Sequence, residues 1–240
     1  MPALSPLAAL NRRITACTAC PRLTAYTAEV ARVRRRAYSD CTYWGRPVPS
    51  FGDERARVLV LGLAPGAHGS NRTGRPFTGD GSGDFLFPVL HQTGFASQPQ
   101  ASGRDDGLTL QNLWISAVVR CAPPGNKPTP EEQRACAPFL DEEIGLLDQL
   151  RVVVCLGKIA FDGLVAHTIR AGQIASRSGL HFAHAAESTL PNGVTILASY
   201  HPSLQNTNTG KLTRPMFLEV FLRARQLAEL DLPSQSAPQR

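Results

Sequence analysis

Residues Gly62–Gly83 read GLAPGAHGSNRTGRPFTGDGSG, and this glycine-rich stretch decides how the rest of the chain is organised. The apolar run Val58–Leu61 leads into it, and its shortness and β-branched content predict a buried parallel strand. Asp84–Thr93 follows with the apolar spacing of a helix. In an open α/β sheet, ligands bind beyond the carboxyl ends of the strands, where such a loop lies. We therefore expect a ligand site at this loop.

Three more apolar runs predict further strands, at Leu113–Val119, Val152–Leu156 and Val194–Ala198. Helices are expected around them, at Leu4–Ala16, Arg22–Arg36, from Thr129 to about Leu147, at Ile159–Ile169 and at Arg214–Leu230. The repeated order of strand, loop and helix predicts an α/β fold, with a short four-stranded parallel sheet flanked by helices on both faces in three layers. Residues 1–230 are expected to form a single domain with an N-terminal arm, and residues 231–240 a disordered tail.

Composition and charge narrow the class of protein. The 240 residues are 42% hydrophobic, which suffices for one sizeable core. No run approaches the roughly 20 apolar residues that cross a bilayer, and Met1–Arg13 lacks a secretory signal. We therefore expect a cytoplasmic protein without a membrane partner. The net charge of +6 and the arginines in Arg32–Arg36 favour contact with phosphates over a merely solvated helix end.

Six cysteines point to a metal site, because disulfides are rare in the cytoplasm. Four of them lie beside turns, prolines or helix starts: Cys17, Cys20, Cys121 and Cys136. They predict a four-thiolate iron–sulfur or zinc site that joins the N-terminal arm to the core, and their spacing does not choose between the two metals. Cys41 is the spare ligand, and Cys155 is expected to be buried as a small hydrophobic residue.

Polar residues follow the predicted strands. His201, in the segment His201-Pro202-Ser203, can donate a hydrogen bond to charge on a leaving group, or it can be an ordinary loop histidine. Ser203 can cap the loop or bind a phosphate. Asp80, between glycines, can position a water molecule or stabilise a cation, or it can simply cap the next helix. Phe77 can stack on a flat ligand or belong to the core. Gly210-Lys211 lacks the earlier glycine of a triphosphatase phosphate loop, since Gln205 stands there.

Taken in order, the motifs resemble the iron–sulfur uracil-DNA glycosylases and are most similar to family 5. The motifs are the Cys-x-x-Cys pair, Gly62–Gly66, Thr73–Asp80, Cys121 to Cys136 around Pro-Pro-Gly-Asn-Lys-Pro, and His201–Ser203. The resemblance extends from about Cys17 to Leu227. It implies a structural 4Fe–4S cluster on the four cysteines named above, and a deoxyuridine that is flipped out of DNA into the cleft.

The resemblance also implies roles for single residues. Asp80 would serve the sugar and the water, His201 would stabilise the departing uracil anion, and Asn126 would hydrogen-bond the edge of the base. From its position after His201 and its apolar side chain, we further expect Leu204 to fill the space that the flipped base leaves in DNA. The implied substrate-binding set is Gly62, Ala64, Pro65, Gly66, Phe77, Ser203 and Leu204.

Family 5 is preferred to family 4 because of the first motif. Family 4 has glutamate where Leu63 stands and an asparagine at about the place of Ala117. Neither Leu63 nor Ala64 can transfer a proton, so Asp80 is the matching carboxylate and Asn126 the replacement for base recognition. A pocket with few base-specific side chains predicts action on uracil and on other deaminated bases such as hypoxanthine.

The expected function is therefore that of a monofunctional uracil-DNA glycosylase in DNA repair, which leaves an abasic site. A monomer in a prokaryotic cytoplasm, associated with the nucleoid, is expected. The alternative is a non-catalytic, metal-stapled DNA-binding module, which leaves the placement of Asp80, Asn126 and His201 at three strand ends unexplained. A hydrolase of small phosphorylated substrates is disfavoured by the missing phosphate loop.

Overall fold

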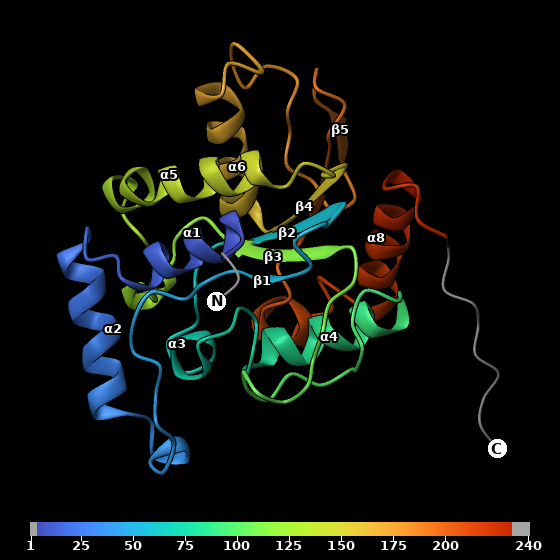
Figure 1. The fold of residues 1–240 in the computed structure, drawn as a ribbon. Helices are drawn as coiled ribbons and strands as arrows, with labels where there is room; N and C mark the ends of the chain where they lie inside the picture. Colours follow the sequence, from blue (N-terminus) through green and yellow to red (C-terminus); the bar gives the residue numbers. More distant parts are fainter. Residues whose placement is uncertain (1–3, 232–240) are drawn as a thin grey trace, which may run out of the picture.

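Helices cover both faces of a central sheet in a computed structural model, which describes residues 4–231 (Figure 1). The four expected strands are present as β2 (Val58–Gly62), β3 (Leu113–Ala117), β4 (Val152–Leu156) and β6 (Thr195–Ser199). They are parallel and adjacent in the order β3-β2-β4-β6. The predicted three-layer α/β architecture is confirmed.

The prediction of a four-stranded, wholly parallel sheet is wrong, because the sheet has six strands. β1 (Phe51–Gly52) pairs antiparallel with β3 at one edge, and β5 (Glu187–Thr189) pairs antiparallel with β6 at the other. β1 is two residues long, and β5 is largely exposed and carries no apolar run. Neither edge strand therefore leaves the hydrophobic pattern by which strands are found in a sequence.

The central strands are buried on both faces, which explains their unbroken apolar runs. Alternate side chains point to opposite faces of the sheet. One face packs against α5 (Pro130–Leu146) and α6 (Lys158–Arg170). The other face packs against α4 (Gly81–Gln92) and α8 (Arg214–Leu227). Cys155 of β4 is fully buried in the first core, as expected.

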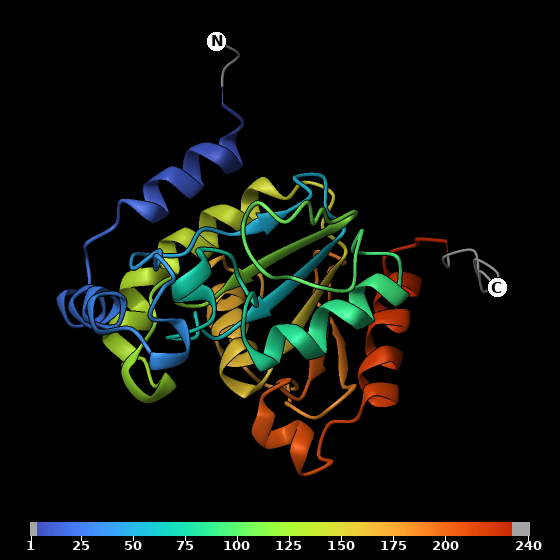
Figure 2. The same cartoon turned by 90° about the horizontal axis from the view of Figure 1, so that it is seen from below.

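The N-terminal arm consists of α1 (Pro6–Thr15) and α2 (Pro21–Val33). α1 packs against α5, and α2 packs against the one-turn helix α3 (Ser70–Thr73). Figure 2 shows α1 and α2 on one side of the molecule and α8 on the other. The expectation that the second helix continues to Arg36 is wrong, because the backbone turns to φ +59° at Arg34. Arg32 therefore lies in the last turn of α2, whereas Arg34, Arg35 and Arg36 lie beyond the end of the helix.

Helix ends follow local chemistry. α5 begins with a capping box, in which Thr129 Oγ1 accepts from the Glu132 N–H at 3.2 Å and the Glu132 carboxylate accepts from the Thr129 N–H at 2.8 Å. A short helix, α7 (Leu204–Asn208), was not expected from the sequence.

Within residues 4–231, no helix is both long and apolar enough to span a bilayer. The predicted disordered tail lies outside the described residues except for Asp231.

Candidate active site

A cavity of about 500 Å³ lies beyond the carboxyl ends of β2, β3 and β6. The sequence-predicted catalytic and substrate-binding residues all line it: Gly62, Ala64, Pro65, Gly66, Phe77, Asp80, Asn126, His201, Ser203 and Leu204. Three loops that are far apart in the sequence therefore meet at one place, as the strand order requires. The volume is that of a typical small-ligand pocket.

Asp80 is the N-cap of α4, so the capping interpretation holds for one of its oxygens. Oδ1 accepts from the backbone N–H groups of Ser82 and Gly83, both at 3.1 Å. Oδ2 lies against Gly66 and Gly69, and a Cβ at Gly69 would approach it to 2.0 Å. No hydrogen bond to Oδ2 is formed within residues 4–231. One oxygen is thus held by the helix end, and the other remains available to a ligand.

Burial raises the pKa of Asp80 above its usual range, and the nearby Asp84 acts in the same direction. The two backbone hydrogen bonds and the positive charge of Arg72 lower the pKa and offset part of this shift. Arg72 is itself fixed, because its Nη2 donates to the Gly79 carbonyl at 2.9 Å. The carboxyl group therefore lies in surroundings that favour proton uptake, as a general base requires.

Phe77 belongs both to the core and to the cavity wall. The side chain is 9% exposed and packs in the core under α4 and α8. The ring lies directly against Gly62, where a Cβ would come within 2.9 Å of Phe77 Cζ. The Phe77 and His201 rings lie 6.1 Å apart between centroids and are tilted by 33°. A flat ligand in the cavity would therefore meet both rings.

His201 follows β6 on a loop that is fixed from within. Asn206 Nδ2 donates to the His201 carbonyl at 2.8 Å. Burial lowers the pKa of His201 to about 4. The imidazole is therefore neutral at pH 7, with one nitrogen as donor and the other as acceptor. A neutral imidazole can donate a hydrogen bond to an anion without giving up its proton.

Three of the predicted residues lie at the cavity mouth. Asn126 is exposed and has a left-handed backbone with φ +57°. Ser203 caps α7, since its Oγ accepts from the Asn206 N–H at 3.4 Å. Leu204 is 60% exposed and lies over Gly81, where a Cβ would come within 2.7 Å of its Cδ2. An exposed leucine at the rim of a polar cavity is available to a large partner.

The sequence does not single out Ser116 and Arg120, which also line the cavity. The Arg120 Nη2 donates to the buried Glu143 carboxylate at 2.6 Å, and Nη1 donates to Ser50 Oγ. Glu143 also accepts from Ser116 Oγ at 2.5 Å and from Trp114 Nε1 at 2.9 Å. For Arg120, the sequence did hold one indication, namely a charged residue directly after an apolar strand and before Cys121. For Glu143 the sequence held no indication, because this residue is one of several acidic residues in the same predicted helix.

The four predicted ligand cysteines, Cys17, Cys20, Cys121 and Cys136, line one small cavity between the N-terminal arm and the start of α5. All four are free thiols. Cys41 does not line this cavity, so the spare ligand is not brought there. Residues 4–231 contain no group of three or more metal-binding side chains already arranged to hold an ion. The structure thus gathers the donors without showing a formed metal centre.

The donor chemistry of this cavity nevertheless fits a thiolate-bound metal. Burial raises the pKa of Cys121 to about 12 and that of Cys136 to about 11, although Arg120 lowers the latter, so both are protonated thiols that would lose their protons to a bound metal. Four free thiols that line one cavity are the donor set of zinc and of iron–sulfur clusters.

Residues 49–225 match the family model described as the uracil DNA glycosylase superfamily. The chain belongs to that superfamily. The type-5 uracil-DNA glycosylase of Thermus thermophilus is 55% identical to it over 92% of this chain and 98% of the relative. The type-5 enzyme of Mycobacterium tuberculosis is 46% identical over 92% of this chain and 82% of the relative.

Relatives of the neighbouring family match the chain less completely. The type-4 uracil-DNA glycosylase of Pyrobaculum aerophilum is 35% identical over 51% of this chain and 55% of the relative. The resemblance to family 5 within the uracil DNA glycosylase superfamily is therefore confirmed.

Proposed function

We propose that this protein removes uracil from DNA by hydrolysing the N-glycosidic bond and leaves an abasic site. The observation that carries the proposal is the shared cavity in which the unpaired Asp80 Oδ2, the neutral His201 ring and the Phe77 ring face one space. The type-5 relatives carry this activity in their names. A base inside a duplex cannot reach such a cavity, so the deoxyuridine is flipped out of the stack.

In the reaction, the bond between the sugar C1′ and the uracil N1 breaks, and its electron pair leaves with uracil. The sugar becomes cation-like while the base becomes an anion. His201 donates a hydrogen bond to the anionic base, and Asp80 stabilises the sugar cation. A water oxygen then bonds to C1′, and the proton it loses passes to Asp80. Asp80 then returns this proton to solvent and the uracil anion takes one up, so charge and atoms balance and the carboxylate is restored.

The cavity walls favour a broad base range. Gly62, Ala64, Pro65 and Ala117 line the cavity and offer a base no side-chain hydrogen bond, while Ser116 and Arg120 in the same cavity donate to Glu143. Asn126 lies at the mouth and is the side chain proposed to bind the base edge. Sites built to hydrogen-bond one ligand reject others most strongly, so this cavity is proposed to accept hypoxanthine and other deaminated bases as well.

We further propose that Cys17, Cys20, Cys121 and Cys136 hold a 4Fe–4S cluster. Two of the cysteines come from the arm and two from the core, so the cluster would stabilise their connection when bound. An ion pair between Arg22 and Glu132 also connects the arm to the core, with Arg22 Nε and Glu132 Oε1 2.7 Å apart. This pair joins the same two parts of the chain beside the cysteines.

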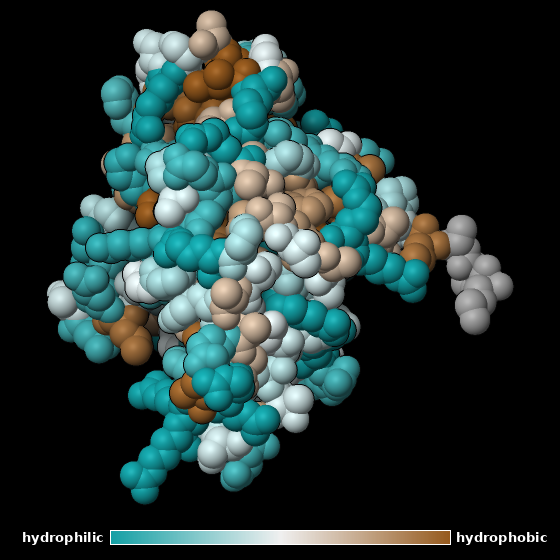
Figure 3. Space-filling model, turned by 90° about the vertical axis from the view of Figure 1, so that its left-hand side faces the viewer, coloured by the Kyte–Doolittle hydropathy of each residue, from teal (hydrophilic) through white to brown (hydrophobic). Residues whose placement is uncertain are grey.

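At the cavity mouth, Leu204 is proposed to enter the duplex and occupy the place of the flipped base. The protein is proposed to act as a monomer in the cytoplasm, at the nucleoid. The face that carries α1 and α2 is largely hydrophilic, with hydrophobic residues in separate patches, so this face offers no continuous apolar surface to a second copy (Figure 3).

The proposal is tested with a labelled duplex that contains one uracil, treated with alkali after incubation. Strand breakage by the parent protein, and a large loss of breakage with His201→Ala, supports it. A duplex with hypoxanthine in the same position tests the base range. Tight binding without any breakage would instead identify a DNA-binding module and overturn the proposal.

A further inference from the structure

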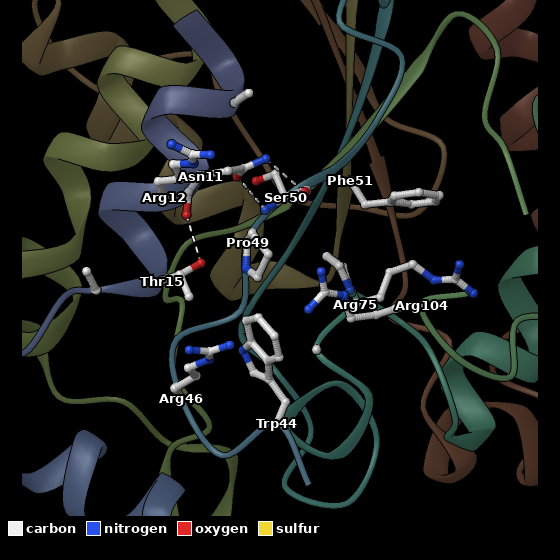
Figure 4. Close-up of a pocket in the computed structure, with 14 residues that line it drawn as sticks. Asn11, Arg12, Thr15, Trp44, Arg46, Pro49, Ser50, Phe51, Arg75 and Arg104 are labelled. Carbon is white, nitrogen blue, oxygen red and sulfur yellow. Dashed lines mark hydrogen bonds between the residues drawn. The ribbon is translucent and has the colours of Figure 1, made fainter. Parts of the chain in front are cut away.

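A second hollow of about 570 Å³ lies between α1 and the segments around Trp44 and Gly74 (Figure 4). We call it the arginine groove, after Arg12, Arg46 and Arg104, which line it. The groove is separate from the base cavity, although Pro76 contributes to the walls of both. None of the catalytic groups discussed above lies in it.

The groove carries a net positive charge. Four arginines line it, and no aspartate or glutamate does. Arg75 is neutralised, because its Nη2 lies 2.5 Å from Asp106 Oδ2 and both side chains are buried. Arg12, Arg46 and Arg104 are exposed and form no ion pair within the described residues. Three guanidinium groups that line one groove without a counter-charge attract an anion large enough to contact them.

Trp44 holds two of these groups in place. The Cζ atoms of Arg46 and Arg104 lie 3.8 Å and 4.4 Å from the centre of its ring. The ring is fixed, because Trp44 Nε1 donates to the Pro47 carbonyl at 3.0 Å and the ring packs on Gly74. A Cβ at Gly74 would come within 2.7 Å of Trp44 Cδ2, so only glycine permits this packing. The two guanidinium groups are therefore ordered before a ligand arrives.

The chemistry of the ligand follows from these groups. Guanidinium groups bind phosphate oxygens in pairs of parallel hydrogen bonds. The groove is open and places its arginines on separate segments, at Arg12 on α1, Arg46 after Trp44, and Arg104 on the loop before β3. Several charges spread along an open hollow suit a chain of phosphates better than a single ion.

We propose that the arginine groove binds the phosphodiester backbone of a nucleic acid strand, at a contact separate from the base cavity. This inference rests on the proposed function, in which DNA is the substrate, and adds a second site at which the protein binds the DNA. Such a contact would contribute affinity for DNA of any sequence, because phosphates carry no base information.

The test compares two double variants that remove equal charge. Arg46→Gln/Arg104→Gln alters the groove. Arg55→Gln/Arg151→Gln is the control, because these exposed arginines lie just before β2 and β4, at the amino ends of the strands, and line neither the groove nor the base cavity. Binding of a fluorescent, undamaged duplex is measured by anisotropy over a series of salt concentrations. Thermal unfolding shows that each variant is folded.

For the groove variant, the slope of log affinity against log salt is expected to become shallower by about 1 to 2, since each lost phosphate contact changes it by roughly 0.9. The control is expected to keep the slope of the parent. An unchanged slope in the folded groove variant would overturn the proposal.

A second arm uses deoxyadenosine monophosphate, with tryptophan fluorescence as the readout; of the two tryptophans, Trp44 lines the groove and Trp114 is buried in the sheet. Saturable quenching that the groove variant loses, together with an unchanged salt slope for DNA, would assign the groove to free nucleotides and overturn the strand contact. Failure of the proposed function is distinguishable, because the parent would then bind undamaged duplex but release no uracil from a uracil-containing one.

Discussion

The guanidinium of Arg120 lies between two cavities and is held there by Glu143. Arg120 Nη2 and Glu143 Oε2 are 2.6 Å apart, and the two side chains are 3% and 0% exposed. Arg120 lines both the base cavity and the cysteine cavity. Because the following residue is Cys121, this ion pair fixes the wall shared by the two sites.

Removing the charge of Glu143 should destabilise the fold strongly. Glu143→Gln leaves Arg120 buried without a counter-charge, which typically costs about 3–5 kcal/mol. The free energy of unfolding, from urea titration followed by circular dichroism, measures the loss. Glu142→Gln is the matched control, because the neighbouring Glu142 pairs with Arg13 at the surface and should change stability little. Similar effects of the two substitutions would contradict a buried, shared ion pair.

Gly62→Ala should impair excision more than folding. Its Cβ would lie 2.9 Å from Phe77 Cζ, so the ring must move away from the cavity wall. Displacement of a group that positions the substrate by about 1 Å can lower the rate about 100-fold. Single-turnover excision of uracil measures the effect. Gly145→Ala, on α5 where a Cβ meets nothing within 4 Å, is the control and should excise normally.

Burial of His201 should make stability depend on pH. Its native pKa is about 4, below the usual 6.5, so the folded state favours the neutral ring. This contribution is complete above pH 6.5 and is lost as the pH falls from 6.5 toward 4, by about 3 kcal/mol at most. His201→Asn should therefore lose less stability than the parent over that range in urea titrations at several pH values. His91→Asn, at an exposed position on α4, is the control and should lose stability with falling pH as the parent does. If His201→Asn lost as much stability as the parent over this range, the pH dependence would not come from His201.

The four-cysteine cavity should bind iron. Protein prepared without oxygen should absorb near 400 nm, the mark of an iron–sulfur cluster. Cys121→Ala should lose the absorbance and the bound iron, whereas Cys41→Ala should keep both, because Cys41 does not line the cavity. Bound zinc in colourless parent protein would favour the other thiolate metal and refute the cluster.

The sequence predicts those helices and strands in which the pattern of apolar residues matches the pattern of buried positions. Val58–Leu61 and Val152–Leu156 are wholly apolar because both faces of those strands are covered, so their positions could be predicted. Glu187–Thr189 could not, because an exposed edge strand is defined by its pairing with β6 rather than by its own side chains.

In the candidate site, too, some residues could be predicted from the local sequence and others only from the folded structure. Asp80, Phe77 and His201 could be found because each stands next to a strand end or a glycine-rich loop. Arg120 also follows a strand, but its burial and its ion pair with Glu143 could not be predicted, because Glu143 comes from a different element and reaches it only in the folded chain. Likewise, only the structure shows that Arg46 and Arg104 share the ring of Trp44.

The most direct measurement is single-turnover excision of uracil by Asp80→Asn, together with its thermal unfolding. Asparagine caps a helix as well as aspartate, so the hydrogen bonds to Ser82 and Gly83 and the melting temperature should be preserved. The loss of the charged Oδ2 should lower the excision rate by about 100- to 1000-fold. A rate within a few-fold of the parent would show that Asp80 only caps α4, and would contradict the proposed chemistry.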